Sequence, residues 1–197
     1  MTNLMTNNRL LIKRMFDLTL AFLGVGLLGL PILILGIVVK VSSPGPILYW
    51  SNRVGQGNLL FKMPKFRTFI IETPAVATHL LKNPEVYLTP IGSFMRKTSL
   101  DELPQIWSIL MGDMSFVGPR PALFNQEDLI SLRKKVGIDI LVPGLTGWAQ
   151  VNGRDDLSIA LKVGFDREYL DRQSLMFDLE ILLLTFIKVI NRSGVSH

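Results

Sequence analysis

The feature that most constrains this chain is an apolar run near its N-terminus. Leu18–Val39 contains 22 residues without a charged side chain. A helix that crosses a bilayer needs about 20 apolar residues, so the run is long enough to enter a membrane. It exceeds the apolar region of about 7–15 residues in a secretory signal, and no small-residue cleavage motif precedes Lys40. The sequence therefore predicts a retained membrane helix.

The run alone does not decide whether this helix spans the bilayer. Arg9, Lys13 and Arg14 precede it, and basic residues also follow it from Lys40 onwards. Orientation depends on a difference in Lys and Arg between the flanks, and here both flanks have the composition of cytoplasmic segments. Pro31, near the middle, removes a backbone hydrogen bond and kinks a helix. A helix broken there that leaves by the face it entered would explain both features, while a spanning helix with a tolerated proline stays open.

Composition narrows the kinds of site that the chain could hold. The length of 197 residues suits one domain, and the absence of cysteine excludes a disulfide scaffold, a thiolate zinc site and a cysteine nucleophile. Residues 1–100 carry 11 Lys and Arg against 3 Asp and Glu, a net charge of +8, whereas residues 101–197 carry 10 against 13, a net charge of −3. The basic half favours an anionic membrane or phosphate-bearing substrates. Nucleic acid suits so apolar a chain poorly, and we expect no nucleic-acid partner.

The remaining chain predicts a small α+β domain that is mainly α. Residues 47–67 are expected to form a hairpin around the turn at Gly55–Asn58, with Pro64 placing the second strand at an edge or a bulge. No Walker loop or glycine-rich dinucleotide motif occurs. Helices are expected at 75–81, 104–111, 125–135 and 158–170, and a loop at 143–147.

The last apolar segment, Leu175–Ile190, is too short and too charged to span a membrane. It is interrupted by Asp178, Glu180 and Lys188. This pattern predicts an amphipathic helix that lies either on the membrane surface or against the core.

The densest group of reactive side chains surrounds Asp101 and Glu102. Adjacent carboxylates point about 100° apart on a helix, so they suit two different roles better than one shared proton. One could be a covalent nucleophile and the other could hold Mg²⁺ together with substrate phosphates. The pattern Ser99-x-x-Glu102 is also a capping box, which needs no catalysis, so the pair alone leaves both interpretations open.

Basic residues in rigid or turn-forming motifs could complete such a site. Arg96 lies five residues before Asp101, Arg120 stands between two prolines, and Arg154 follows Asn152-Gly153. Guanidinium forks match phosphate oxygens, so three of them near a carboxylate–metal centre would suit a diphosphate substrate. Taken singly, each is more often a surface ion-pair partner. Two further cations, which could meet substrate phosphates or lipid head groups, are Lys65 and Arg67.

These motifs occur together, in this order, in one known family. From about Arg9 to Ile190 the chain resembles the bacterial sugar transferases, monotopic phosphoglycosyl transferases that act on polyprenol phosphate. The motifs that carry the resemblance are Lys13-Arg14-x-x-Asp17, Ser43-x-Gly45-Pro46, Arg53-Val54-Gly55, Lys65-Phe66-Arg67-Thr68, Thr98-Ser99-Leu100-Asp101-Glu102-Leu103-Pro104-Gln105, Gly112-Asp113-Met114-Ser115-x-Val117-Gly118-Pro119-Arg120-Pro121, Pro143-Gly144-x-Thr146-Gly147 and Gln150-Val151-Asn152-Gly153-Arg154.

The resemblance implies a topology and a domain plan. The N-terminal helix, residues 9–40, would be re-entrant and broken at Pro31, with both ends cytoplasmic. Residues 41–197 would form the cytoplasmic helical part, with amphipathic surface helices, of a single catalytic domain over 1–197. The protein would be monotopic in the bacterial inner membrane, with its active site on the cytoplasmic face.

The resemblance also implies a reaction. Such enzymes transfer a sugar phosphate from a UDP-sugar to polyprenol (undecaprenyl) phosphate and release UMP. Asp101 corresponds to the nucleophile that forms a phosphosugar–enzyme intermediate, and Glu102 to a Mg²⁺ ligand with Asp101 beside the metal. Three arginines match phosphate-contacting positions: Arg96, Arg120 and Arg154.

We therefore expect a Mg²⁺-dependent transferase that serves the first membrane step of bacterial glycoconjugate assembly, in contact with membrane lipid. The competing hypothesis is a non-catalytic, membrane-anchored scaffold or anionic-lipid-binding protein of a glycan assembly complex, because the N-terminal half is cationic. The sequence leaves open the sugar, the pathway and the oligomeric state, a homo-oligomer included.

Overall fold

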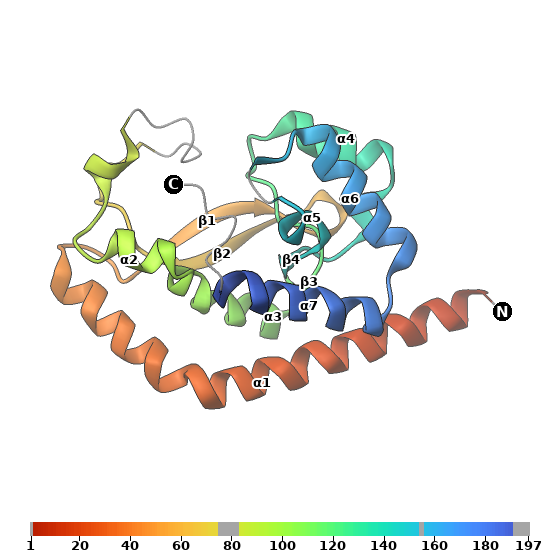
Figure 1. The fold of residues 1–197 in the computed structure, drawn as a ribbon, viewed down its shortest axis with the longest axis horizontal. Coiled ribbons are helices and arrows are strands. Elements are labelled where there is room, and N and C mark those ends of the chain that lie inside the picture. Colours follow the sequence, from red (N-terminus) through yellow and green to blue (C-terminus); the bar gives the residue numbers. More distant parts are fainter. Residues whose placement is uncertain (1, 75–82, 154–155, 191–197) are drawn as a thin grey trace.

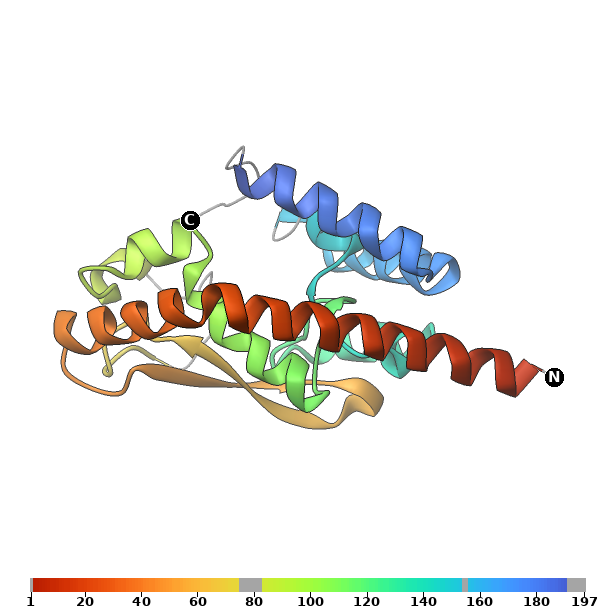
Figure 2. The same ribbon diagram turned by 90° about the horizontal axis from the view of Figure 1, so that it is seen from below.

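One long helix lies along a mainly helical domain. The computed structural model describes residues 2–74, 83–153 and 156–190, so the helix expected at 75–81 lies outside the described residues. The N-terminal helix α1 (Thr2–Ser42) arches beneath the other elements (Figure 1). Seen from below, it runs the length of the molecule, with the hairpin on one side and α2 and α7 on the other (Figure 2). The expected α+β, mainly helical composition is confirmed.

The helix α1 passes Pro31 without interruption. The helix therefore does not break at Pro31, contrary to the prediction. It is curved instead, with its concave side toward the domain (Figure 1). A proline removes one hydrogen bond, and the flanking turns keep theirs, so a bend without an end to the helix is physically sufficient. By length and composition Arg9–Ser42 could cross a membrane. A re-entrant path stays a prediction.

The predicted hairpin is confirmed. Strands β1 (Leu48–Val54) and β2 (Leu60–Phe66) pair antiparallel and are joined through η1 (Gln56–Asn58). Pro64 lies opposite Trp50 in a two-stranded sheet, where a missing N–H is tolerated because each strand is an edge.

The expected loop at 143–147 is wrong in part, because it contains a strand. Strand β4 (Gly144–Thr146) pairs in parallel with β3 (Ser115–Val117). Gly118 and Gly144 lie where the two backbones meet, and a β-carbon on either would collide with main-chain atoms of the other segment. A three-residue strand is too short to produce a readable alternation of apolar and polar residues, so the sequence pattern missed it.

Helices supply most of the remaining fold. The expected helix at 104–111 is divided into a 3₁₀ segment and an α-helix, while those at 125–135 and 158–170 are confirmed within two residues. Ser158 caps the second of these by accepting a hydrogen bond from the Leu161 N–H. The helical elements are η3 (Pro84–Tyr87), α2 (Gly92–Lys97), η4 (Leu100–Gln105), α3 (Ile106–Met111), α4 (Glu127–Lys135), η5 (Ile138–Ile140), α5 (Trp148–Val151), α6 (Ile159–Arg172) and α7 (Leu175–Ile190).

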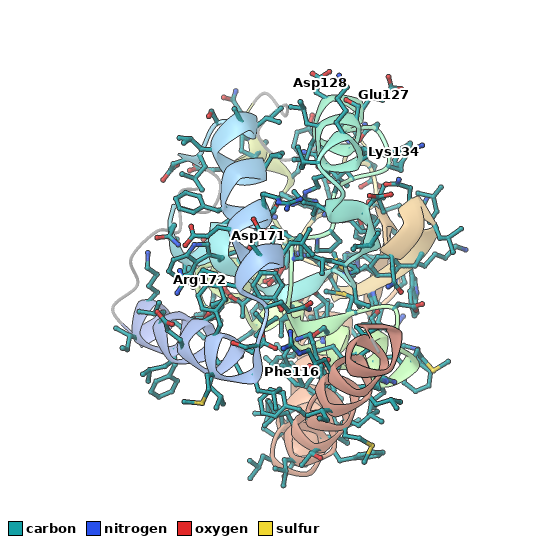
Figure 3. All side chains as sticks on the ribbon, turned by 90° about the vertical axis from the view of Figure 1, so that its right-hand side faces the viewer. Phe116, Glu127, Asp128, Lys134, Asp171 and Arg172 are labelled. Carbon is teal, nitrogen blue, oxygen red and sulfur yellow. The ribbon has the colours of Figure 1, made fainter. Side chains whose placement is uncertain are left out.

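The helix α1 belongs partly to the core. Ala21 is fully buried against a cluster that includes Ile109, and Val39 is fully buried in a second cluster with Phe66. A third cluster joins α4, α6 and α7. Phe116 packs against both the first and the third cluster and lies between α1 and α7 (Figure 3). The apolar helix therefore packs against the domain along one face.

Polar side chains also connect α1 to the domain. Arg14 donates to the carbonyls of Ile109 and Leu110 at the end of α3. The carboxylate of Asp17 accepts the N–H of Phe116 in β3 at 3.1 Å. Lys13 pairs with Asp178 of α7 at 2.7 Å. The basic turn before the apolar run thus contacts three elements of the domain.

The structure shows that Leu175–Ile190 forms the helix α7 with one face against the core and an apolar face exposed. Phe177 and Ile181 are buried in the third cluster, so the helix does lie against the core. Met176, Leu183 and Phe186 are more than half exposed, which leaves an apolar face toward solvent. Contact of that face with lipid stays a prediction.

Candidate active site

Asp101 and Glu102 lie in the first turn of η4, which leads into α3. The residue before this turn, Ser99, adopts a left-handed conformation with φ 56° and its side chain makes no capping hydrogen bond. The capping box is therefore not formed. The carboxylate that would complete it, that of Glu102, bonds elsewhere instead.

The side chain of Glu102 accepts hydrogen bonds from two cations. Lys65 of β2 donates to Oε1 at 2.7 Å, and Arg120, which follows β3, donates to the same oxygen at 3.2 Å. The strand β2, which precedes η4 in the chain, packs closely on it. Arg120 comes shortly after β3, which follows η4 in the chain. Residues 37 and 18 positions apart in sequence thus converge on one carboxylate.

Asp101 is buried within the same group of charges. Burial raises the pKa of Asp101 above its ordinary value, and the positive charge of Lys65 is the main influence that opposes this rise. Burial also lowers the pKa of Lys65, while Glu102 opposes that change. Arg96 of α2 contributes a further positive charge to Asp101, and its guanidinium lies over the Phe69 ring, 4.9 Å from the centroid.

The resulting site is a buried, charge-paired cluster of two carboxylates with Lys65, Arg96 and Arg120 around them. Paired charges in a partly dry environment interact strongly, and each cation is a donor suited to phosphate oxygens. The cluster can hold an anionic substrate next to a buried carboxylate. That is the combination that phosphoryl transfer through a covalent intermediate requires.

The chain matches a known protein family over most of its length. Residues 8–192 match the family model described as bacterial sugar transferase. The chain belongs to this family.

Among its relatives within the bacterial sugar transferases, UDP-glucose:undecaprenyl-phosphate glucose-1-phosphate transferase of Escherichia coli (strain K12) is 41% identical over 92% of this chain and 40% of its own length. The sugar transferase EpsL of Bacillus subtilis (strain 168) is 38% identical over 95% of this chain and 92% of its own length. Undecaprenyl-phosphate galactose phosphotransferase of Salmonella typhimurium is 33% identical over 98% of this chain and 43% of its own length. The chain thus spans less than half of the first and third relatives.

Of the predicted site residues that the structure describes, Arg67 is not brought into the cluster of this sugar transferase. Arg67 is 5% exposed, and its guanidinium donates to the carbonyls of Pro46 at 2.7 Å and Ser43 at 2.9 Å, in the loop after α1. Arg154 lies outside the described residues. A substrate contact of either residue stays a prediction.

The two carboxylates of the site suit Mg²⁺ only if phosphate oxygens of the substrate complete the set of ligands. Within 2–74, 83–153 and 156–190, no group of three or more Asp, Glu, His or Cys side chains could hold a metal ion. Mg²⁺ is commonly bound through one or two carboxylates together with substrate phosphates. Asp101 and Glu102 fit that mode, because they supply hard oxygen ligands beside cations that favour a diphosphate.

Sequence reasoning missed a second group of residues behind the site. Arg133 of α4 forms a buried ion pair with Asp166 of α6, with Nη2 and Oδ2 2.7 Å apart. Arg133 also donates to the main-chain carbonyl of Arg120 at 2.8 Å. These residues are 33 positions apart and lie in no recognisable motif, so only the folded chain shows that they meet.

Proposed function

We propose that this sugar transferase moves a sugar 1-phosphate from a UDP-sugar to polyprenol (undecaprenyl) phosphate, with Asp101 as the covalent nucleophile. The observation that carries the proposal is the convergence of Lys65 and Arg120 on Glu102, directly beside the buried Asp101. The names of the Escherichia coli and Salmonella relatives support the same class of substrates. Such a reaction would begin the assembly of a bacterial glycoconjugate on its lipid carrier.

The first chemical step forms an aspartyl phosphosugar. A carboxylate oxygen of Asp101 attacks the phosphorus atom next to the sugar, and the bond from that phosphorus to the oxygen of UMP breaks. UMP leaves with the bonding electron pair. Arg120 and Arg96 hold the negatively charged phosphate oxygens in line with the attacking carboxylate, which is where most of the catalysis of phosphoryl transfer arises.

The second step returns the enzyme to its starting state. An oxygen of polyprenol phosphate attacks the same phosphorus, and the bond between that phosphorus and the Asp101 oxygen breaks. The products are polyprenyl-diphosphate-sugar and the free carboxylate. Because burial raises the pKa of Asp101, the positive charge of Lys65 is important for keeping this carboxylate ionised as a nucleophile and as a leaving group.

Glu102, with Asp101 beside it, would hold Mg²⁺ together with the diphosphate. When bound, the ion would neutralise part of the negative charge of the diphosphate. Lys65 keeps Glu102 oriented toward the site through its 2.7 Å contact.

We place the site at the cytoplasmic face of the inner membrane. The support is that α3, which follows η4, packs directly on the apolar helix α1. A polyprenol phosphate anchored in the bilayer would present its head group at that depth. The re-entrant course of α1 and the monotopic arrangement belong to this proposal.

The test is release of UMP by the purified protein in lipid nanodiscs with Mg²⁺, polyprenol phosphate and a panel of UDP-sugars. We expect wild-type activity with at least one sugar and a rate below about one thousandth of it for Asp101→Asn. Asp128→Asn is the matched control, because Asp128 is an exposed carboxylate that projects outward from α4 (Figure 3). Normal turnover by Asp101→Asn would exclude the nucleophile.

Mass spectrometry separates the enzyme from the non-catalytic scaffold. With a UDP-sugar present and polyprenol phosphate withheld, the peptide that contains Asp101 should gain the mass of one sugar phosphate. Asp101→Asn should gain none. A scaffold would show no adduct in either protein and would keep its lipid binding in both.

A further inference from the structure

The segment that carries Arg120 is held almost entirely through its carbonyl groups. Pro119 and Pro121 flank the arginine and have no N–H to donate, although both fix φ. Each of the four consecutive carbonyls from Pro119 to Ala122 nevertheless accepts a hydrogen bond. The donors, in that order, are the Gly144 N–H at 2.9 Å, Arg133 Nη1 at 2.8 Å, Arg53 Nη1 at 3.1 Å and the Val54 N–H at 2.9 Å.

Two of these contacts fix the peptide groups on either side of the Arg120 α-carbon. The Gly144 N–H holds the preceding group through the Pro119 carbonyl, and Arg133 holds the following group through the Arg120 carbonyl. Together the two groups set the direction in which the Arg120 side chain leaves the backbone. Rotation of the peptide group held by Arg133 would re-aim the Arg120 guanidinium, which donates to Glu102 Oε1 at 3.2 Å. Misplacement of a substrate-holding group by about 1 Å can lower a rate by about a hundredfold.

Arg133 is itself held in place by Asp166. The Nε and Nη2 groups of Arg133 both donate to Asp166 Oδ2, at 2.9 and 2.7 Å, and the carboxylate side chain is 1% exposed. The planar guanidinium has its donors at fixed angles, so two donors on Asp166 determine where Nη1 points. Nη1 points at the carbonyl of Arg120. A buried ion pair is weak evidence for stability, because its desolvation cost is large, so a positional role is the better explanation for this one.

We infer that Arg133, oriented by Asp166, is a positioning residue for Arg120 and acts on turnover through the Arg120 main chain. The inference rests on the proposed function, in which the Arg120 guanidinium holds the substrate diphosphate. Arg133 and Asp166 lie on α4 and α6 and would touch neither the substrate nor the reacting atoms.

The test variant is the double substitution Arg133→Met with Asp166→Leu. Removal of both charges avoids an uncompensated buried carboxylate, and replacement of a buried ion pair by apolar residues often leaves a fold stable. We expect kcat/KM for the UDP-sugar to fall about tenfold to a hundredfold while the thermal unfolding midpoint stays near that of the wild type. Arg133→Lys keeps an ion pair but loses the guanidinium fork, so its kcat/KM should fall by a similar factor. This variant provides the measurement if the double variant does not fold.

A second background distinguishes a positioning role from a general structural one. In Arg120→Lys, the flexible ammonium no longer depends on a fixed peptide, so the same Arg133 variants should lower kcat/KM by about twofold at most. An equal loss in both backgrounds would show that Arg133 does not act through Arg120 and would overturn the inference. So would variants that retain wild-type kcat/KM.

Arg167→Met is the matched control. Arg167 of α6 also pairs with a carboxylate, that of Asp171, and donates to a main-chain carbonyl, that of Val136 at 2.9 Å. Its carbonyl acceptor lies outside the Arg120 segment, so kcat/KM should not change. A wild-type protein inactive with every UDP-sugar would instead overturn the proposed function, and this inference with it.

Discussion

Lys65 and Arg120 share one oxygen of Glu102 but are not equivalent. The Lys65 contact is 0.5 Å shorter, and its side chain is 16% exposed against 30% for Arg120. A buried, short ion pair loses more when it is broken than a longer and wetter one. We therefore expect Arg120 to turn toward an incoming diphosphate, while Lys65 stays with Glu102.

Ser99 provides a stability prediction that separates capping from catalysis. Its left-handed backbone is unfavourable for a residue with a β-carbon, and its side chain makes no capping bond. Ser99→Ala should therefore shift the thermal unfolding midpoint by less than about 2 °C, and Ser99→Gly should leave it unchanged or raise it by up to about 4 °C.

A functioning capping box gives the opposite result for Ser99. Loss of a cap costs about 1 kcal/mol, so Ser99→Ala would then lower the midpoint by about 2–4 °C. The matched comparison is Ser158→Ala on α6, where the serine does accept the Leu161 N–H and such a loss is expected.

At the residue level, the sequence could single out side chains that the fold brings together only where a local motif marks them. The Asp101–Glu102 pair and Arg120 could be selected, because motifs place them near turns and prolines. The same spacing fits a capping box, which only the observed partners of Glu102 exclude. Arg133 and Asp166 could not be selected, because their meeting depends on the packing of α4 against α6.

At the level of elements, local turn chemistry determines what the sequence reveals. The hairpin could be predicted because the turn at Gly55–Asn58 separates two apolar runs. The parallel pair β3–β4 could not, because its strands are three residues long and are joined by a connection of 26 residues, 118–143. That pair is what places the Arg120 segment against Gly144.

The contact between α1 and α7 should make stability depend on pH when Lys13 is removed. Burial raises the pKa of Asp178, and the positive charge of Lys13 is the main influence that opposes this rise. Lys13→Met should therefore raise the pKa of Asp178 further. Below the ordinary pKa of an aspartate the carboxyl is protonated in both the folded and the unfolded variant, and little is lost. As pH rises from there to the raised folded-state pKa, the unfolded chain releases a proton that the folded chain keeps, so the variant should be destabilised by up to about 3 kcal/mol.

Thermal unfolding of wild type and Lys13→Met between pH 4 and 8 measures this effect. The difference between the two midpoints should increase with pH. Lys40→Met is the control, because Lys40 lies on the same helix, is exposed and donates to the main-chain carbonyl of Gly45. A difference for Lys13→Met that is independent of pH would contradict the linkage to Asp178.

At the scale of the whole molecule, apolar and charged surfaces lie at opposite ends. The helices α1 and α7 lie together on one side, and the charged side chains of Glu127, Asp128 and Lys134 on α4 project from the other (Figure 3). The apolar run predicted membrane association from its length alone. Its path through the bilayer could not be predicted from charge, because both flanks are basic.

Cysteine labelling tests that path, because the chain contains no cysteine and single substitutions report without background. Arg9 precedes the apolar run, and Asn52 on β1 follows it; both are exposed, whereas the neighbouring Ser51 is buried and would label poorly. If α1 is re-entrant, a membrane-impermeant maleimide should label Arg9→Cys and Asn52→Cys in inverted inner-membrane vesicles and neither in intact cells. Leu27→Cys, which is 78% exposed in the protein alone, should resist labelling in both because lipid covers it. Labelling of Arg9→Cys and Asn52→Cys from opposite sides would establish a spanning helix.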